Sequence, residues 1–472
     1  MTDQLGALVT IFTEFYFFLT VVLMFFIHFG FCMYEVGVSR TKNVQHTLLK
    51  NTMAIPLIGL CFFLFGMWIY IAFQGWPVNS LSLSLSTGFE PWSDKIAPNL
   101  TDRISGVFLA AFALFGMTAG SIVSGSLIER TKTSAFFIIA IYVGAIAWVI
   151  PAAWAWAGNG WMAQYLGFHD QYCSAILHSV AGFATLGVLM HLGPRIGKFA
   201  PDGTPREIPP HNPWMVTLGL FMIFIGFWGF YAACHIPIAN VAAEGATAFW
   251  TTTNIYGVPI TLSGVVMNFL LALFGGMVTA YIVSKGNPFW TYSGGLTGLI
   301  SASAGNDFYH PVIALTIAVA GTVMAYKLHY WVERRFKIDD AVGAVAVHGY
   351  CGVFGGVVAG FALWGYPAIM PSAGTAVVLS EGAGWFGVNA EGLPIVTPIG
   401  NLIGTLVFAL GFGLLPGWVL GKILSSLGML RVSPEKELLG LDGKHAATTY
   451  PAHSGLEAEF EAIQRAEAKI SR

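Results

Sequence analysis

Long apolar runs separated by short polar connections dominate the sequence. Each run is long enough for an α-helix to cross a hydrocarbon core of ~30 Å. The pattern therefore predicts an all-α polytopic membrane protein, with a transmembrane domain at residues 1–427 and a tail at residues 428–472. We predict eleven transmembrane helices, at residues 8–34, 48–74, 104–127, 134–157, 170–192, 212–233, 257–284, 288–306, 309–333, 341–367 and 396–426.

Composition agrees with this class and excludes others. Charged residues make up 10% of the chain and hydrophobic residues 56%, and the mean hydropathy is +0.69. A soluble domain carries about 25% charged residues. The net charge of −2 and the lack of a basic patch do not favour nucleic acid as a partner. The five cysteines lie in apolar stretches without C-x-x-C spacing, so the sequence predicts neither a disulfide framework nor a metal or other cofactor.

The distribution of Lys and Arg predicts the topology. The first apolar run has no cationic segment before it and is longer than a signal sequence, so we expect it to be retained. With the N-terminus outside the cell membrane, only Lys95 and Arg103 fall in external connections, as the positive-inside rule requires. An odd number of spans then places the C-terminal tail in the cytoplasm. The cytoplasmic connections hold Arg40, Lys42, Lys50, Arg130, Lys132, Arg195, Lys198, Arg206, Lys285, Arg334, Arg335 and Lys337.

An internal repeat is the most informative feature. The pattern D-x7-H-x3-G occurs at residues 170–182 and again at residues 340–352, in the fifth and tenth predicted helices. The topology makes these helices antiparallel, so the chain is predicted to hold two inverted five-helix repeats plus an eleventh helix. Because eight residues of helix rise about 12 Å, His178 and His348 each lie near mid-membrane. Inverted repeats of this kind place the transported species near the midplane, at the interface of the two halves.

The residues of the repeat differ in their expected roles. Asp170 and Asp340 open their helices, where an aspartate most often caps free N–H groups, so we expect structural roles near the site. Ionisable residues at mid-membrane depth are expensive and mark transport pathways or proton relays. Two histidines at equivalent positions therefore favour a functional pair, His178 and His348. His28 either lines the same cavity or is a packed, hydrogen-bonded residue.

Several stretches carry a specific resemblance. Across nearly its whole length the chain resembles the ammonium transporter (Amt/Rh) family, which implies an eleven-helix fold and conduction of ammonium or ammonia past twin histidines. The resemblance also implies a homotrimer with one pore per subunit and, at the tail and inner loops, a cytoplasmic regulatory protein of the PII type. The stretches are GFCMYEVGVSRTKN (30–43), SIVSGSLIERTKTSA (121–135), HNPWMVTLGLFMIFIGFWGFYAA (211–233), GLTGLISASAGNDF (295–308), KIDDAVGAVAVHGYCG (337–352) and RVSPEKELLGLD (431–442).

The resemblance also implies roles for individual residues. Phe115 and Phe230 match the family's two stacked gate phenylalanines, with Phe112 as an alternative register for the first. Trp156 resembles the tryptophan that holds the cation at the recruitment mouth by a cation–π contact; the alternative is an interfacial belt tryptophan. Ser303 takes the place of a pore-lining hydroxyl.

Departures from the family pattern concentrate at the mouth. The family's usual serine is Cys234, the usual asparagine is Tyr231, which we place in the pore lining, and the usual glutamine is Phe112. A thiol is a poorer hydrogen-bond acceptor than a hydroxyl, so we expect the mouth to rely more on aromatic faces. Ala341 replaces a proline, and the tail departs from the family at Lys444.

Residues 454–472 extend beyond the resemblance. Leu456, Ile463 and Ile470 recur every seven residues. The segment is either a short amphipathic helix on the cytoplasmic face of a trimer or a solvated terminus.

The mechanism expected from these residues follows from solvation. A bare cation in an apolar pore costs several kcal/mol, so ammonium should give up its proton before or while crossing. A hydrogen-bonded pair of neutral imidazoles offers an acceptor and donors that guide ammonia or relay the proton. Both net transport of ammonia and transport of ammonia with a proton agree with this arrangement.

Three other functions compete with ammonium transport. An ammonium sensor with the same fold is compatible with the altered mouth, Tyr231 and Cys234. A membrane enzyme that uses His178 and His348 as metal or haem ligands is disfavoured, because neither histidine has a second ligand at i+3 or i+4. A carbon dioxide channel is disfavoured by Trp156 and the gate phenylalanines.

Overall fold

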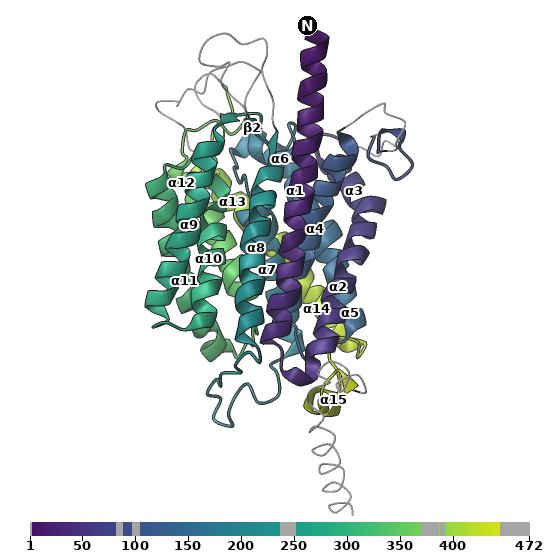
Figure 1. Ribbon diagram of the computed structural model, residues 1–472, viewed down its shortest axis with the longest axis vertical. Coiled ribbons are helices and arrows are strands. Elements are labelled where there is room, and N and C mark those ends of the chain that lie inside the picture. Colours follow the sequence, from purple (N-terminus) through teal and green to yellow (C-terminus); the bar gives the residue numbers. More distant parts are fainter. Residues whose placement is uncertain are drawn as a thin grey trace, which may run out of the picture.

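The computed structural model describes residues 2–81, 88–96, 104–236, 252–369, 387 and 392–443. Figure 1 shows a bundle of long helices that run side by side, with the N-terminus and the short β-strands at one end and α15 at the other. The helices are α1 (Thr2–Val38), α2 (Val44–Cys61), α3 (Met67–Phe73), α4 (Ser105–Ser126), α5 (Thr133–Tyr142), α6 (Val149–Trp156), α7 (Val180–Leu192), α8 (Pro213–Ala233), α9 (Leu262–Val283), α10 (Pro288–Ala302), α11 (Pro311–Phe336), α12 (Cys351–Ala362), α13 (Pro398–Leu406), α14 (Leu415–Ser426) and α15 (Pro434–Leu439). The strands are β1 (His235–Ile236), β2 (Thr252–Asn254) and β3 (Pro259–Ile260).

The predicted spans correspond closely to these helices. In the described part of the chain, ten helices are long and apolar enough to cross a membrane. The span predicted at 288–306 is α10, which has 15 residues, continues into a 3₁₀ turn at 303–305 and is not among those ten. Helix α10 packs against α9, α11 and α12 within the bundle. The all-α polytopic fold is thus confirmed, with a three-stranded antiparallel sheet at one end as a small addition.

Sequence signals set where several helices begin. Asn212 accepts a hydrogen bond from the Met215 N–H at 3.1 Å and precedes Pro213 at the first helical position of α8. Thr397 caps α13 in the same way, and Pro398 follows it. A capping side chain satisfies a free N–H group, and proline tolerates the position because it has none. Polar-then-Pro pairs therefore fix the starts of these spans.

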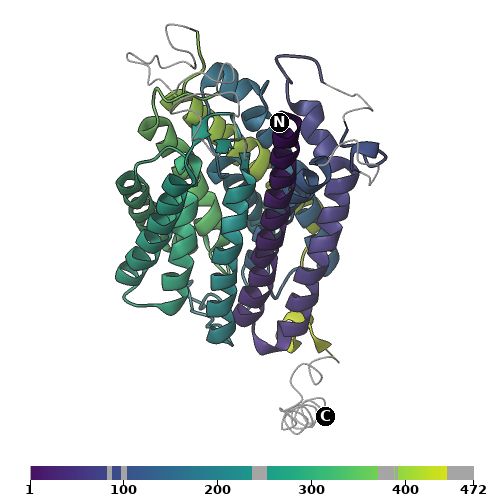
Figure 2. The same cartoon turned by 45° about the horizontal axis from the view of Figure 1, so that its top comes forward.

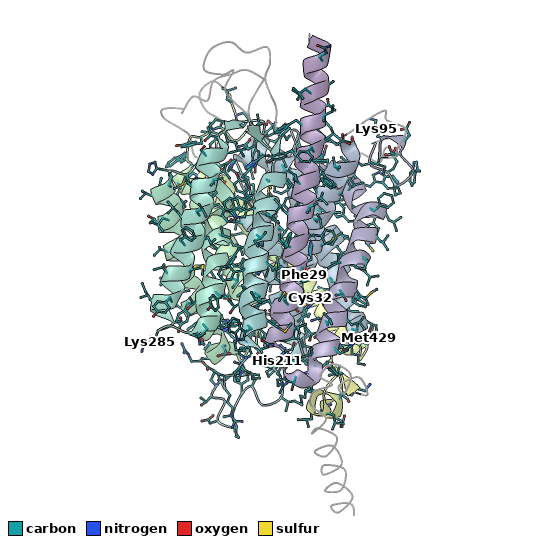
Figure 3. All side chains as sticks on the ribbon, viewed as in Figure 1. Phe29, Cys32, Lys95, His211, Lys285 and Met429 are labelled. Atoms are coloured by element: carbon teal, nitrogen blue, oxygen red, sulfur yellow. The ribbon has the colours of Figure 1, made fainter. Side chains whose placement is uncertain are left out.

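The lateral surface of the bundle is apolar. Phe29, labelled on the outward face of α1 in Figure 3, is 57% exposed, and many other large apolar side chains are exposed along the same helices. Lys95 and Lys285 are labelled at opposite ends of the molecule. An apolar belt between polar ends is what a bilayer requires, because lipid offers no hydrogen-bond partners.

Helices α1 and α8 form a close contact and begin the two halves of the chain. They lie side by side in both views of the ribbon (Figure 1 and Figure 2) and pack along most of their length. A Cβ added at Gly30 would lie 2.5 Å from the Gly219 carbonyl oxygen, and one at Gly229 would lie 2.7 Å from the Met24 nitrogen. Glycine lets the two backbones approach, as in other membrane helix pairs.

An ion-pair network joins the connections at the end opposite the N-terminus. Arg40 donates to Glu129 through its backbone N–H at 2.5 Å and its Nε at 2.7 Å, and Arg195 donates to Asp339 through Nε at 2.9 Å. Arg130 donates to the Asp339 carbonyl at 2.7 Å. Burial alone would raise the pKa of Asp339, but Arg195 and Arg130 hold it well below its usual value. The carboxylate therefore stays ionised and ties three connections together.

The start of the C-terminal tail packs on this same end. Asp442 accepts the backbone N–H groups of residues 45 and 46 at 2.9 and 2.8 Å, and Lys42 donates to the Glu437 carbonyl at 2.8 Å. Arg431 pairs with Glu437 at 2.7 Å. The predictions for Lys444 and for residues 454–472 lie outside the described residues.

Lys50 does not lie in the connection that the charge pattern predicts. The distribution of Lys and Arg predicts a cytoplasmic connection for it, but it lies within α2 and is 1% exposed. A carboxylate on α1, Glu35, lies 3.7 Å from its Nζ. A buried cation needs such a partner, and the apolar run around Lys50 conceals that pairing in the sequence.

Candidate functional site

Asp170 shapes the turn that carries His178. Its two carboxylate oxygens accept three hydrogen bonds, of 2.7 to 2.8 Å, from the N–H groups of residues 174–176. These residues begin a π-helical turn at 174–179, and Cys173 before it has a φ of 73°. One carboxylate therefore satisfies the N–H groups that the abrupt start of the helix would leave free.

The second half of the repeat has the same construction. Asp340 accepts the N–H groups of Val345 at 2.9 Å and Ala346 at 3.4 Å, and it also binds the Ser126 hydroxyl. The π-helical turn at 345–350 then carries His348. Matching caps and matching π-helical turns are what two inverted repeats predict.

The two histidines meet at the centre of the bundle. Nδ1 of His348 lies 3.1 Å from Nδ1 of His178, and the ring centroids are 5.1 Å apart. Both side chains are buried, and Nε2 of His178 has no hydrogen-bond partner among the described residues. One ring must donate and the other accept, so the pair shares one proton between two nitrogens.

Glycines make this contact possible. A Cβ at Gly182 would collide with the backbone of Gly349, and one at Gly352 would lie 2.6 Å from the Ser179 nitrogen. The final residue of each D-x7-H-x3-G pattern thus lets the two turns cross closely enough for their histidines to touch.

Aromatic rings connect the histidines to the end of the bundle that holds the N-terminus. The rings of Phe230 and His178 are 5.7 Å apart with planes at 24°. Phe115 meets Phe230 edge-on at 4.4 Å, and the next ring, Trp156, lies 6.0 Å from Phe115. The structure therefore brings both predicted gate residues and the predicted mouth tryptophan into one series of contacts.

Hydrogen bonding and packing orient Trp156. Its indole N–H donates to the Asp170 carbonyl at 2.8 Å, which joins the tryptophan to the cap of the histidine turn. Phe112 packs against Trp156 and Phe115 at 6.0 and 5.9 Å. Phe112 thus lies behind the contact between Phe115 and Phe230, and Phe115 is the residue of α4 that meets Phe230.

Three other predicted residues are hydrogen-bonded to neighbouring groups of the protein. The hydroxyls of Tyr231 and Ser303 are 2.8 Å apart, and Asn306 donates to Tyr231 at 3.0 Å. The Cys234 thiol donates to the Phe230 carbonyl at 3.5 Å. The Ser303 hydroxyl also donates to the Leu299 carbonyl at 2.7 Å, so the donors of all three residues are used, and the contacts join the end of α8 to the end of α10.

A buried polar cluster near Trp156 was missed by sequence reasoning. His169 lies 3.1 Å from Asp307 and stacks on Tyr256 at 4.5 Å, and Asn254 donates to Asp307 at 2.9 Å. The Tyr256 hydroxyl accepts the Asp170 N–H at 2.9 Å. The signal available in the sequence was the histidine directly before Asp170, but its partners are more than 80 residues away in the chain.

His28 and His235 lie apart from the pair. His28 is buried between α1 and α4, with Nδ1 3.5 Å from the Ser121 hydroxyl. His235 lies beside the Tyr172 hydroxyl at 2.6 Å, and burial lowers its pKa to about 4, although Asp307 opposes the shift. Among the described residues, no three His, Cys, Asp or Glu side chains are grouped as a metal site would require.

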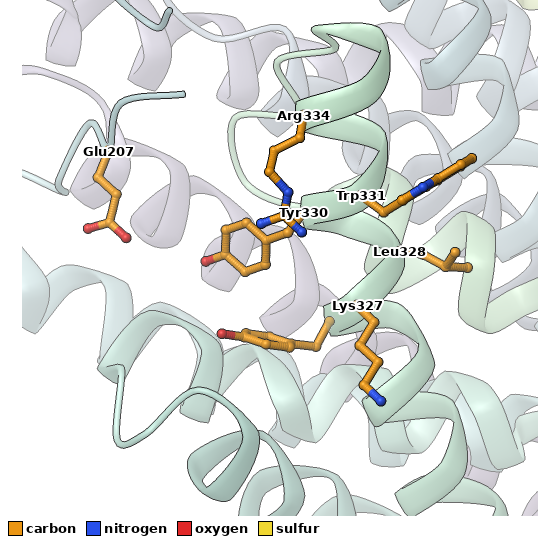
Figure 4. A pocket seen from close by; sticks show the side chains of 7 residues that line it. Glu207, Lys327, Leu328, Tyr330, Trp331 and Arg334 are labelled. Carbon is orange, nitrogen blue, oxygen red and sulfur yellow. The ribbon is translucent and has the colours of Figure 1, made fainter. Parts of the chain in front are cut away.

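Another hollow lies away from the histidine pair. It has a volume of about 730 Å³ and is an open groove beside α11. Figure 4 shows Glu207 facing Tyr330 and Arg334 across it. A much smaller cavity, of about 20 Å³, lies directly against His348.

The chain is similar to proteins of one known family. A family model described as Ammonium Transporter Family matches residues 14–450. The chain is 31% identical to Ammonium transporter Amt2 of Archaeoglobus fulgidus, over 93% of this chain and 88% of that protein. It is also 31% identical to Ammonium transporter Amt2 of Methanocaldococcus jannaschii, over 92% of this chain and 91% of that protein.

Solved structures share the fold. A structure titled Sensor Amt Protein aligns with a TM-score of 0.73 at 23% identity, over 94% of this chain and all of that one. Mep2 of Saccharomyces cerevisiae aligns with a TM-score of 0.68 at 17% identity, over 90% of this chain and 88% of that one. Together with the family match across most of its length, these likenesses show that the chain belongs to the ammonium transporter family.

Proposed function

We propose that this protein conducts ammonium-derived nitrogen across a cell membrane, along a path through Trp156, the Phe115 and Phe230 gate and the pair His178 and His348. The observation that carries the proposal is the direct contact between the two histidines, 3.1 Å apart at the end of an aromatic series. Membership of the ammonium transporter family supports the substrate.

The first step takes place at the mouth. Trp156 meets Phe112 and Phe115 edge-on, and the quadrupoles of these rings attract a cation at the mouth. Because Cys234, Tyr231 and Ser303 are hydrogen-bonded to other protein groups, aromatic faces supply most of the attraction for the ammonium ion. The edge-on contact of Phe115 and Phe230 excludes hydrated ions.

The second step takes place at the histidines. An ammonium ion that loses its water cannot cross an apolar pore as a bare cation at low cost, so it gives up a proton before or at the gate. The free Nε2 of His178 is an acceptor or donor available to the passing molecule. The shared Nδ1 contact transmits a change of tautomer from one ring to the other.

The arrangement of charge supports an orientation with the N-terminus outside and the tail in the cytoplasm. Lys95 lies at the end of the bundle that holds the N-terminus, and Lys285 lies at the opposite end (Figure 3). The same opposite end holds the Arg130 and Arg195 network. The family resemblance further supports a homotrimer with one path per subunit and, at the tail, a regulator of the PII type.

Current measurements on reconstituted protein test the proposed function. Ammonium added to proteoliposomes on a solid support should evoke a saturable current, and methylammonium should compete with it. A folded protein that binds ammonium yet passes neither current nor ammonia would instead be a receptor. Vesicles without protein, and vesicles challenged with an equal potassium step, provide the controls.

A further inference from the structure

A cavity for a single small molecule lies against His348, on the side of the histidine pair away from Trp156. Its volume is about 20 Å³, which is room for one molecule of the size of water. His348, Phe31, Tyr34 and Ser293 contribute to its wall, and so does one carboxylate, Glu35. A charged group in the wall of so small a cavity indicates a specific occupant.

One oxygen of Glu35 is fully engaged with the protein. Oε2 accepts from the Asn51 amide at 2.9 Å and from the Ser124 hydroxyl at 2.6 Å, and Lys50 Nζ lies 3.7 Å away. Lys50 is itself fixed, because it donates to the Ser124 carbonyl at 3.0 Å. The carboxylate is therefore held in place by groups from α2 and α4.

The other oxygen of Glu35 has no partner. Oε1 is buried, the residue is 1% exposed, and no described residue donates to this atom. A Cβ built on Gly125 would lie 3.3 Å from Oε1 and in contact with Val342, and Val342 itself lines the cavity. Oε2 is hydrogen-bonded within the protein, whereas Oε1 lies near Val342, a residue of the cavity wall.

An unsatisfied carboxylate oxygen in a buried site is costly, so a donor molecule is expected there. We propose that the cavity is a binding site for one ammonium ion, with Oε1 of Glu35 as its principal acceptor; this deepens the proposed function and rests on it. Ammonium fits the chemistry because it is cationic and donates in every direction. The Phe31 ring, 6.3 Å from the His348 ring, adds an aromatic wall to the cavity.

The site binds ammonium on the tail side of the histidine pair, separately from the mouth at Trp156. Ammonia that passes His348 accepts the proton that the histidine pair relays, and the resulting ammonium is held by Glu35 before release. In the reverse direction, an ion meets Glu35 before it reaches the histidines. Glu35 is therefore expected to set the affinity on one side of the membrane alone.

Planar bilayers with ammonium on one side at a time test this site. Glu35→Gln keeps the shape and removes the charge, so the half-saturating ammonium concentration on the tail side should rise about tenfold or more, the usual weight of a charged hydrogen bond. The half-saturating concentration on the Trp156 side should stay within about twofold. Glu333→Gln is the matched control: Glu333 is a buried carboxylate at the same end of the bundle, paired with Lys198 and not lining this cavity.

A second variant guards against misfolding. Glu35→Gln leaves Lys50 without a countercharge, so Glu35→Gln combined with Lys50→Met removes both charges together. The double variant should show the same one-sided rise. An unchanged tail-side value, or an equal rise on both sides, in either folded variant overturns the site. Absence of both ammonium current and ammonia flux from the unmodified protein would refute the proposed function instead, so the two failures are distinct.

Discussion

The cap formed by Asp170 gives the sharpest prediction about how the histidine pair is held. Three N–H groups donate to this buried carboxylate, two to Oδ2 and one to Oδ1. Hydrogen bonds to a charged group contribute about 1.5–3 kcal/mol each. Asp170→Ala removes all three, so we expect a loss of about 4 kcal/mol or more in the free energy of unfolding.

Asp170→Asn keeps the shape of the side chain and removes its charge. If the amide oxygen takes the place of Oδ2, two hydrogen bonds remain, and the amide NH₂ group faces the Ser174 N–H. We expect a loss of about 2 kcal/mol, between the wild type and the alanine variant. Asp340→Ala removes two backbone hydrogen bonds, one of them 3.4 Å long, and the bond from the Ser126 hydroxyl, so it should also destabilise the protein.

The assay measures thermal unfolding of purified protein in detergent, together with ammonium current after reconstitution. The melting temperature should fall in the order wild type, Asp170→Asn, Asp170→Ala. Current should fall with it, because His178 belongs to the turn that Asp170 caps. An Asp170→Ala variant with the melting temperature and current of the wild type would refute the cap as the support of His178.

Two further predictions concern the gate and the ion-pair network. Phe115→Ala should change ammonium flux strongly while Phe112→Ala changes it less, because Phe115 is the ring that meets Phe230; flux assays with both variants decide, and the reverse order would refute this assignment. Asp339→Asn should destabilise the protein at neutral pH. Because the pKa of Asp339 is lowered in the folded protein, its ionised carboxylate contributes its full stabilisation at pH values above its unfolded pKa of about 4. That stabilisation is lost as the pH falls towards the folded pKa, so the difference in melting temperature from wild type should shrink in acid; a constant difference would contradict the ion pair with Arg195.

The fold followed from local patterns. Apolar length predicted the spans, and polar-then-proline pairs such as Asn212 and Pro213 explain where helices begin. Periodicity also located the histidines, because an eight-residue offset from a capping aspartate fixes the depth of each one. The π-helical turns that carry them were not predicted, since π-turns depend on tertiary contacts such as the approach of Gly182 to Gly349.

Side-chain partners were harder to predict than positions. Glu35 and Lys50 each occur beside an apolar run, and nothing local shows that they pair. His169 and Asp307 are 138 residues apart in the chain and meet only in the folded protein. Such contacts between distant segments depend on how whole helices pack, which spacing within one helix does not record.

The most direct test of the account is the ammonium current of variants in the histidine pair. His178→Leu, His348→Leu and the double variant retain bulk and remove the shared hydrogen bond of 3.1 Å. We expect each single variant to lose most of the current and the double variant to lose little more, because either change already breaks the same contact. A folded double variant that carries ammonium current at the wild-type rate would contradict the relay and leave His178 and His348 as packing residues.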